Sequence, residues 1–275
     1  MLARERQSYI AGRVRDRGAV RVSDLTRELN VSDMTVRRDL DHLARQGIVD
    51  KVHGGATVPG RNSTDEPGFE NKSARERTEK DAIAATATTL VRPGFAVGLS
   101  AGTTTWRLAQ QLLEVPGITV VTNSVQIASV FYQNPRPDQT IVLTGGVRTP
   151  SDALVGPIAV ATLRSLNLDI VFLGVHGMDE RTGFSSPNLL EAETNRALAQ
   201  SGRRLVVVAD HTKWGVVGIS TIAALEDADV VVTDAGLHPD ARAILAERVS
   251  DVLVCPVPVP VPVTPVASGS REEVS

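Results

Sequence analysis

The sequence predicts the α/β fold class, with a small N-terminal winged helix-turn-helix domain and a larger α/β domain on a mostly parallel, Rossmann-like sheet. The chain has 275 residues, enough for two domains. Apolar residues make up 42% of it but aromatic residues only 3%, so Val, Leu, Ile and Ala must form the core, as in strands buried on both faces of a parallel sheet. Three short helical patterns open the chain, and strand and helix patterns alternate after residue 72.

Three helices are expected at the N-terminus, over residues 4–17, 23–29 and 32–46. Ser23 and Ser32 are suitable N-caps for the second and third of them. Apolar residues recur at helical spacing in each pattern: Ile10 and Val14, Leu25 and Leu29, and Val36, Leu40 and Leu43. Two short helices joined by a tight turn within such a unit predict a helix-turn-helix.

A β-wing is expected after the third helix, because residues 48–53 read as a short strand and Gly54 and Gly55 as a turn. Pro and Gly then recur in a segment with few apolar residues, which we interpret as a linker. The end of the chain alternates Pro with Val, as in an extended, disordered tail. The expected organisation is therefore a winged helix-turn-helix domain at 1–56, a linker at 57–72, a larger α/β domain at 73–255 and a tail at 256–275.

The larger domain should begin with a helix over residues 73–91. Seven strand patterns follow, separated by helical or mixed segments, and they span residues 96–99, 118–121, 140–143, 169–173, 205–209, 230–233 and 252–254. Such an alternation is typical of a parallel sheet covered by helices.

Charge and composition limit the partners of the chain. Residues 1–80 carry 16 basic and 13 acidic side chains, and residues 81–275 carry 13 basic and 19 acidic ones. This difference suits an anionic partner for the N-terminal domain, or else chance variation in charge along the chain. Cys255 is the single cysteine, so no disulfide can form within the chain, which suits a reducing compartment. The start of the chain lacks the pattern of a signal peptide. The longest uncharged run, residues 115–135, contains Pro116 and Gln126 and is too polar for a membrane span. We therefore expect a cytoplasmic protein with no membrane span. The five His residues show no ligand spacing, so we expect no metal and no cofactor.

The third helix is the expected DNA-reading element. In a helix-turn-helix the second helix of the pair lies in the major groove and its N-terminal residues contact base edges. Arg suits bidentate contact with guanine, and Thr suits a thymine methyl or a phosphate. The alternative is a small helical domain whose charged face is merely solvated. The candidate DNA-binding residues are Ser32, Asp33, Met34, Thr35, Arg37 and Arg38 on the helix and Lys51 and His53 on the wing.

This region resembles the N-terminal domain of the DeoR family of bacterial repressors. The resemblance rests on VSDMTVRRDLDHL at residues 31–43 and on Lys51-x-His53 followed by Gly-Gly-Ala. In that family the Val-Ser-x-x-Thr-Val-Arg-Arg-Asp-Leu run forms the recognition helix and His-Gly-Gly-Ala closes the wing. The resemblance therefore implies that the domain binds double-stranded operator DNA.

The loop SAGTTT, residues 100–105, is a candidate anion site. It joins a strand to a helix, and small residues there expose backbone N–H groups at the positive end of the helix dipole. It has neither the Walker nor the GxGxxG pattern, and an ordinary helix cap would look similar. The candidate phosphate-binding residues in it are Ser100, Gly102, Thr103, Thr104 and Thr105.

Polar groups also follow four other strands. In open α/β sheets, ligands bind outside the carboxyl ends of the strands, so these groups are expected to converge, although each alone suits a loop cap. The candidates are Asn123, Gly145, Gly146, Arg148, Asp179, Asp210 and Lys213, with His176 close by.

The larger domain resembles the DeoR sensor domain, which is similar to ribose-5-phosphate isomerase. The resemblance covers about residues 1–235 and rests on SAGTTT, VTNS at 121–124, the glycine pair at 145 and 146, FLG at 172–174 and ADHTK at 209–213. It implies that Asp179, Glu191 and Lys213 line a sugar-phosphate site. The lysine and glycine loop of the isomerases is missing, and His176 replaces an acid, so half of the equipment for proton transfer is absent.

These observations favour a transcriptional repressor of sugar-metabolism genes that is controlled by a phosphorylated sugar and is not an enzyme. The alternatives are a sugar-phosphate isomerase with an accessory DNA-binding domain and a constitutive architectural DNA-binding protein. A single helix-turn-helix offers limited base contact, so we expect a homodimer or a higher homo-oligomer that is assembled through the larger domain.

Overall fold

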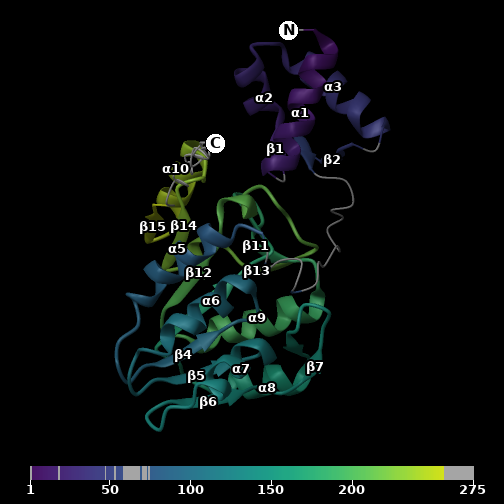
Figure 1. Cartoon of the computed structure of the whole chain (residues 1–275). Coiled ribbons are helices and arrows are strands. Elements are labelled where there is room, and N and C mark those ends of the chain that lie inside the picture. The colour runs from purple at the N-terminus through teal and green to yellow at the C-terminus, as the bar shows by residue number, and fades with distance from the viewer. Residues whose placement is uncertain are drawn as a thin grey trace, which may run out of the picture.

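The computed structural model describes residues 2–17, 19–46, 48–52, 54–57, 69, 73 and 75–256. Figure 1 shows a small group of helices lying above a larger α/β unit, and we call these the head (described residues up to 57) and the body (residues 75–256). The α/β fold class is confirmed. The expected linker and tail, and with them His53, lie largely or wholly outside the described residues.

The head is a three-helix unit with a small antiparallel sheet of order β1-β3-β2. The expected residues Ile10, Val14, Leu25, Val36 and Leu40 are at most 1% exposed and form its core. Its elements are α1 (Ala3–Arg17), β1 (Ala19–Arg21), α2 (Val22–Leu29), α3 (Asp33–Arg45), β2 (Asp50–Val52) and β3 (Gly55–Thr57). The sequence indicated only one of the three wing strands.

The expectation for the start of α2 was wrong. The N-cap is Arg21 and not Ser23, and Arg21 makes no side-chain cap. Since β1 runs directly into the helix, the backbone N–H of Val22 donates to the carbonyl of Gly54 at 2.8 Å. The turn between β2 and β3 therefore satisfies a first-turn donor of α2, which a serine cap would otherwise do.

The body is built on a seven-stranded sheet of order β15-β14-β12-β9-β4-β5-β6, in which every neighbouring pair is parallel. All seven predicted strands are confirmed, and their ends differ from the expected ones by at most one residue. The strands are β4 (Ala96–Leu99), β5 (Thr119–Thr122), β6 (Thr140–Leu143), β9 (Ile170–Gly174), β12 (Leu205–Val208), β14 (Val230–Asp234) and β15 (Asp251–Cys255).

Helices cover both faces of this sheet, which explains the near-continuous apolar strands. Val206 and Val207 are both fully buried and belong to different core clusters, because successive side chains of a strand point to opposite faces. The helices are α5 (Arg77–Thr88), α6 (Thr103–Leu112), α7 (Val125–Gln133), α8 (Pro157–Arg164), α9 (Leu189–Ser201) and α10 (Pro239–Arg248).

Short strands that the sequence did not indicate surround the carboxyl edge of the main sheet. The backbone packs closely in one of them: a Cβ atom at Gly177 would lie 2.1 Å from the carbonyl oxygen of Val216. They are the pair β7 (Val147–Arg148) and β8 (Leu154–Val155) and the sheet of β10 (Gly177–Asp179), β11 (Gly183–Ser186) and β13 (Ser220–Ala223). Two 3-10 turns, η1 (His211–Lys213) and η2 (Leu225–Asp227), complete the body.

Candidate functional site

The first turn of α3 is capped and presents polar side chains to solvent. Ser32 is the N-cap, as expected, and its Oγ accepts a hydrogen bond from the Thr35 N–H at 3.2 Å. Asp33 and Met34 are exposed and Thr35 is half-buried, while the stripe that includes Val36 faces the core. The helix therefore offers the face that a groove-reading helix needs.

Arg37 and Arg38 both lie on this exposed face. The Nε of Arg37 donates to the Asp33 carboxylate at 2.5 Å, and this hydrogen bond raises the pKa of Arg37. On the wing, Lys51 is paired with Asp41 of α3 at 2.5 Å, which lowers the pKa of Asp41. Both ion pairs are exposed, so exchanging their carboxylates for DNA phosphates or bases costs little.

Asp39 holds α3 in place and was missed in the sequence. It is 3% exposed, and its carboxylate accepts from Arg6 Nε at 2.5 Å and from Gln7 Nε2 at 2.9 Å. Both donors come from α1, so the pair fixes the orientation of the exposed face of α3. In the sequence, Asp39 stands directly before the core residue Leu40 in the Arg-Arg-Asp-Leu run.

A cavity of about 70 Å³ lies outside the carboxyl ends of β4, β9 and β12. The predicted residues Gly102, Thr103, Thr104, Glu191 and Lys213 line it together, although they are spread over more than a hundred positions of the chain. Further lining residues that the sequence did not single out include Phe69, Lys80, Ser151, Ser186 and Asn195.

Lys80 of α5 is the most unusual of these residues. It is 3% exposed, its Nζ donates to the Arg75 carbonyl at 2.5 Å, and burial lowers its pKa to about 8 although nearby Asp210 acts in the opposite direction. A signal existed in the sequence: Lys80 begins the buried helical stripe that continues with Ile83, Ala84 and Ala87. A lysine in an apolar stripe calls for an anionic partner.

The cavity therefore combines three sources of positive potential: Lys80, Lys213 and the first turn of α6. The first N–H groups of a helix have no acceptor within the helix, and those of Thr103 and Thr104 belong to residues that line the cavity. The low dielectric constant of a buried site strengthens the attraction between these groups and an anion. This arrangement is suited to bind a phosphate group.

Three other predicted residues support the loop and do not line the cavity. Ser100 is fully buried and its Oγ accepts from the Gly174 N–H at 2.9 Å, which ties β4 to β9. Thr105 Oγ1 donates to the Gly102 carbonyl at 3.0 Å. Asn123 Oδ1 accepts from the Ala101 N–H at 2.8 Å. These bonds hold the backbone of residues 100–105 in the shape that exposes its N–H groups.

The other predicted ligand residues lie elsewhere. Arg148 is exposed and donates from Nε to Asp152 at 2.7 Å, and Gly145 and Gly146 do not line the cavity. Glycine is required at 146, where φ is +120° and a Cβ would lie 2.5 Å from the Val155 carbonyl oxygen. This pair of glycines therefore shapes the β7–β8 hairpin.

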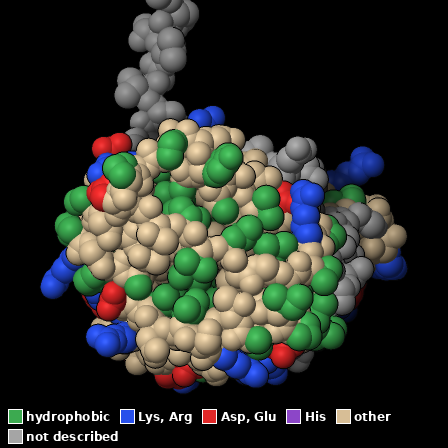
Figure 2. Space-filling view, turned by 90° about the horizontal axis from the view of Figure 1, so that it is seen from below, with side chains coloured by type: hydrophobic (Ala, Val, Ile, Leu, Met, Phe, Trp, Pro, Cys, Tyr) green, Lys and Arg blue, Asp and Glu red, His purple; other side chains and the backbone are tan. Residues whose placement is uncertain are grey.

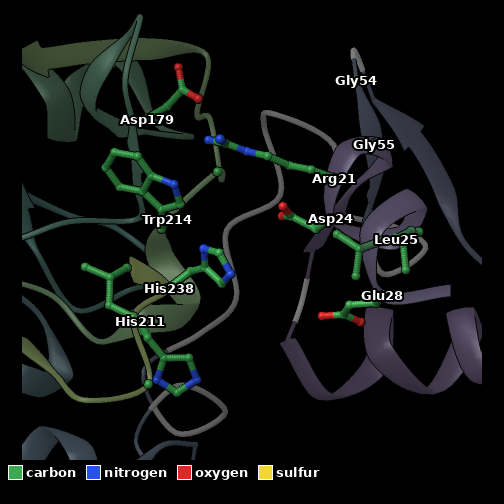
Figure 3. A pocket seen from close by; sticks show the side chains of 14 residues that line it. Arg21, Asp24, Leu25, Glu28, Gly54, Gly55, Asp179, His211, Trp214 and His238 are labelled. Carbon is green, nitrogen blue, oxygen red and sulfur yellow. The ribbon is translucent and has the colours of Figure 1, made fainter. Parts of the chain in front are cut away.

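Asp210 and Asp179 do not line this cavity. Asp210 is fully buried; its Oδ1 accepts from the Thr212 N–H at 3.1 Å, and its Oδ2 has no hydrogen-bond partner among the described residues. Asp179 instead lines a second cavity, of about 240 Å³, between the head and the body. Figure 3 shows its carboxylate beside that cavity, near the side chain of Arg21.

The described residues show neither a metal-binding cluster nor a membrane-spanning helix. The described part of the chain contains no group of three or more His, Cys, Asp or Glu side chains that would hold a metal ion. Within the same residues, each helix is too short or too polar to traverse a lipid bilayer.

Comparisons with known proteins identify the family of the head and of the body. Family models match for the DeoR-like helix-turn-helix domain at residues 6–62 and for the DeoR C terminal sensor domain at residues 75–235. The uncharacterized HTH-type transcriptional regulator YgbI of Escherichia coli K12 is 38% identical over 92% of this chain and 98% of that protein. The glycerol-3-phosphate regulon repressor of the same strain is 28% identical over 91% of this chain and 98% of its own. Ribose 5-phosphate isomerase A from Methanocaldococcus jannaschii aligns with a TM-score of 0.36 and 17% identity, over 49% of this chain and 53% of that chain.

Proposed function

The chain belongs to the DeoR family of DNA-binding transcriptional regulators, and from this premise we propose that it represses sugar-metabolism genes and leaves its operator when a phosphorylated sugar occupies the cavity of the body. It is a regulator and not an enzyme, so the isomerase alternative is set aside. The observation that carries the proposal is the burial of Lys80 against the cavity that Lys213 and the first turn of α6 also line.

The phosphate is proposed to rest on the N–H groups of the first turn of α6, with Lys80 and Lys213 supplying the charge. A dianion there offsets the cost of burying Lys80. One relative is named for glycerol 3-phosphate, a phosphorylated polyol, which agrees with this class of ligand.

The sugar is proposed to lie toward Glu191 and Asn195, which can hydrogen-bond to hydroxyl groups. Glu191 already accepts from the Thr149 hydroxyl at 2.7 Å and from the Ser151 hydroxyl. Its carboxylate is therefore oriented before the ligand arrives. Asp179 and Asp210 do not line the cavity and are not proposed to contact the ligand.

Calorimetry with a panel of triose, pentose and hexose phosphates tests the site. The native protein should bind at least one of them, and Lys213→Ala should bind it at least about tenfold more weakly, because a buried charge-assisted bond contributes about 1.5–3 kcal/mol. The control is Arg148→Ala, which removes an exposed cation outside the cavity and should bind as the native protein does. Equal binding by Lys213→Ala, or no binding by the native protein, contradicts the site.

The DNA partner is proposed to meet the exposed start of α3 in the major groove and the wing on its backbone. The proposed contact residues are Ser32, Asp33, Met34, Thr35, Arg37, Arg38, Lys51 and His53. Support comes from the capped, exposed first turn of α3 and from the family match of the head. A protein that binds DNA in this way is expected to work in the cytoplasm of a bacterial-type cell.

A homodimer is proposed to form through the end of the body shown in Figure 2. Hydrophobic side chains gather on that face, which lies below β6, α7 and α8 in Figure 1. Tyr132 of α7, Leu143 of β6 and Ile158 of α8 are 85%, 43% and 65% exposed, and β6 is an edge strand of the sheet. A second copy on this face would cover the edge and supply a second head for a two-fold operator. Sedimentation of Leu143→Glu tests this, with Ile219→Glu as the control on another exposed apolar residue.

A further inference from the structure

The head and the body meet across the cavity of about 240 Å³ that Figure 3 shows. The guanidinium of Arg21 reaches from the head over the indole ring of Trp214, at 5.9 Å from the ring centroid. Nearby, Arg27 of α2 is paired with Asp240 of α10 at 3.5 Å. A space of this size beside these contacts is typical of a contact that can open, since permanent interfaces pack like protein interiors.

The docked position leaves the DNA-reading face free. On the head, the cavity is lined by residues of β1, α2 and the wing turn, and no residue of α3 lines it. Figure 1 places α3 on the side of the head away from the body. The head is therefore docked in an orientation in which α3 can enter a groove.

A single turn of chain connects this interface with the proposed sugar-phosphate cavity. Within residues 210–214, Lys213 lines the sugar-phosphate cavity, whereas His211 and Trp214 line the cavity between head and body. The Lys213 N–H donates to the Asp210 carbonyl at 3.0 Å and the Trp214 N–H donates to the His211 carbonyl at 3.3 Å. Adjacent side chains of one hydrogen-bonded turn thus face two different sites.

The turn is anchored at its start and at its end. His211 N–H and Nδ1 both bond to the carboxylate of Asp234, each at 2.8 Å, and the N–H of Gly215 donates to the Met178 carbonyl at 2.8 Å. Because both ends are held, a displacement of the Lys213 backbone would be taken up by rotation of the turn, which would move the ring of Trp214.

We propose that residues 210–214 transmit occupancy of the sugar-phosphate cavity to the head, by withdrawing Trp214 from Arg21 and releasing the docked head. This inference rests on the proposed function, because it takes the same cavity as the effector site. Docking fixes the orientation of α3 for a two-fold operator. Release leaves each head free to rotate, so the operator is bound more weakly although no DNA-contacting residue changes.

The test uses Trp214→Leu in the full chain, with Val217→Ala as a control on an exposed residue of the same loop. Trp214 belongs to the body, so its loss removes the docking contact without removing a head residue that can touch DNA. Three quantities are measured: the maximum dimension by solution X-ray scattering without DNA, the affinity for the tightest-binding sugar phosphate of the panel, and operator affinity with and without that compound.

Trp214→Leu should have a larger maximum dimension and should bind the sugar phosphate within about twofold of the native affinity. Its operator affinity should fall at least about fivefold. That affinity should change little when the sugar phosphate is added, because the coupling between the two sites is lost. Val217→Ala should match the native protein. Arg21→Ala removes the same contact from the head and should show the same extension, which keeps the test valid if Trp214→Leu misfolds.

A compact Trp214→Leu, or one whose operator binding responds fully to the sugar phosphate, overturns the inference while leaving the proposed function intact. If the native protein binds no compound of the panel, the proposed function fails and the coupling fails with it. The scattering comparison then still decides whether Trp214 docks the head.

Discussion

Replacing Lys80 by Met should make the protein more stable and less able to bind its effector. The pKa of Lys80 is lowered from 10.5 to about 8, because the folded state buries its charge. At about 1.4 kcal/mol per pH unit, that charge costs the folded state about 3 kcal/mol at pH 7. Met fills similar space without the charge. The substitution removes one donor from the Arg75 carbonyl and one nearby cation from Asp210, so the net gain should be about 1–3 kcal/mol.

The dependence on pH isolates the lysine from these other effects. A lysine whose pKa is lowered by folding destabilises the protein fully below pH 8, and the penalty disappears as the pH rises from 8 toward 10.5. Between pH 7 and pH 9.5, the difference in unfolding free energy between Lys80→Met and the native protein should therefore shrink by about 2 kcal/mol. Urea unfolding at the two pH values measures it.

The matched control is Arg77→Met, which removes an exposed cation from the same helix. Its effect on stability should be small and nearly the same at both pH values. Calorimetry on Lys80→Met should show sugar-phosphate binding at least about tenfold weaker than in the native protein. A difference in stability that stays constant from pH 7 to pH 9.5, or undiminished ligand binding, would refute the reasoning about this buried charge.

Four further outcomes are expected. Arg38→Ala should weaken specific operator binding by about 1–3 kcal/mol in anisotropy titrations, and the affinity should fall steeply with salt; equal binding by the variant would contradict the groove assignment. Asp39→Ala leaves Arg6 without its buried partner and should lower the melting temperature through a loss of about 2–3 kcal/mol, whereas an unchanged melting temperature would remove Asp39 as the anchor of α3. The Asp234 hydrogen bond raises the pKa of His211, so the stability lost in His211→Asn should be largest below pH 6.5 and should disappear as the pH rises through the raised value, as measured by urea unfolding at several pH values. The purified protein should not isomerise ribose 5-phosphate, and turnover of about 1 per second or more would restore the enzyme alternative.

Local sequence patterns were sufficient for the strands of the main sheet and the helices of the head, but not for the short strands around them. The seven strands of the main sheet are short, bounded apolar runs, and their parallel arrangement follows from the helices between them. The stripe of Val36 and Leu40 predicted both the core and the exposed face of α3, since one side of an amphipathic helix must be buried. The loop at residues 100–105 was recognisable because small residues between a strand and a helix leave backbone donors unpaired.

The candidate cavity was only partly predictable. Glu191 and Lys213 were expected through the family resemblance, and the structure places both on its lining. Ser100 and Asn123 have the right chemistry for a ligand, yet the structure uses them to hold the loop. A polar side chain at a strand end looks the same in sequence whether it faces a ligand or a neighbouring backbone, because the choice depends on chain segments far away.

The sequence by itself therefore determined the two-part α/β architecture, the face of α3 and the strand–loop–helix unit at residues 100–105, since each depends on periodicity or spacing within a few residues. Only the tertiary structure decided that Lys80 of α5 meets Lys213 across one cavity, and that Trp214 meets Arg21 of the head. These pairs are more than a hundred residues apart in the chain. Their contacts arise from the packing of helices on the sheet and of head on body, and no local pattern specifies how such surfaces come together.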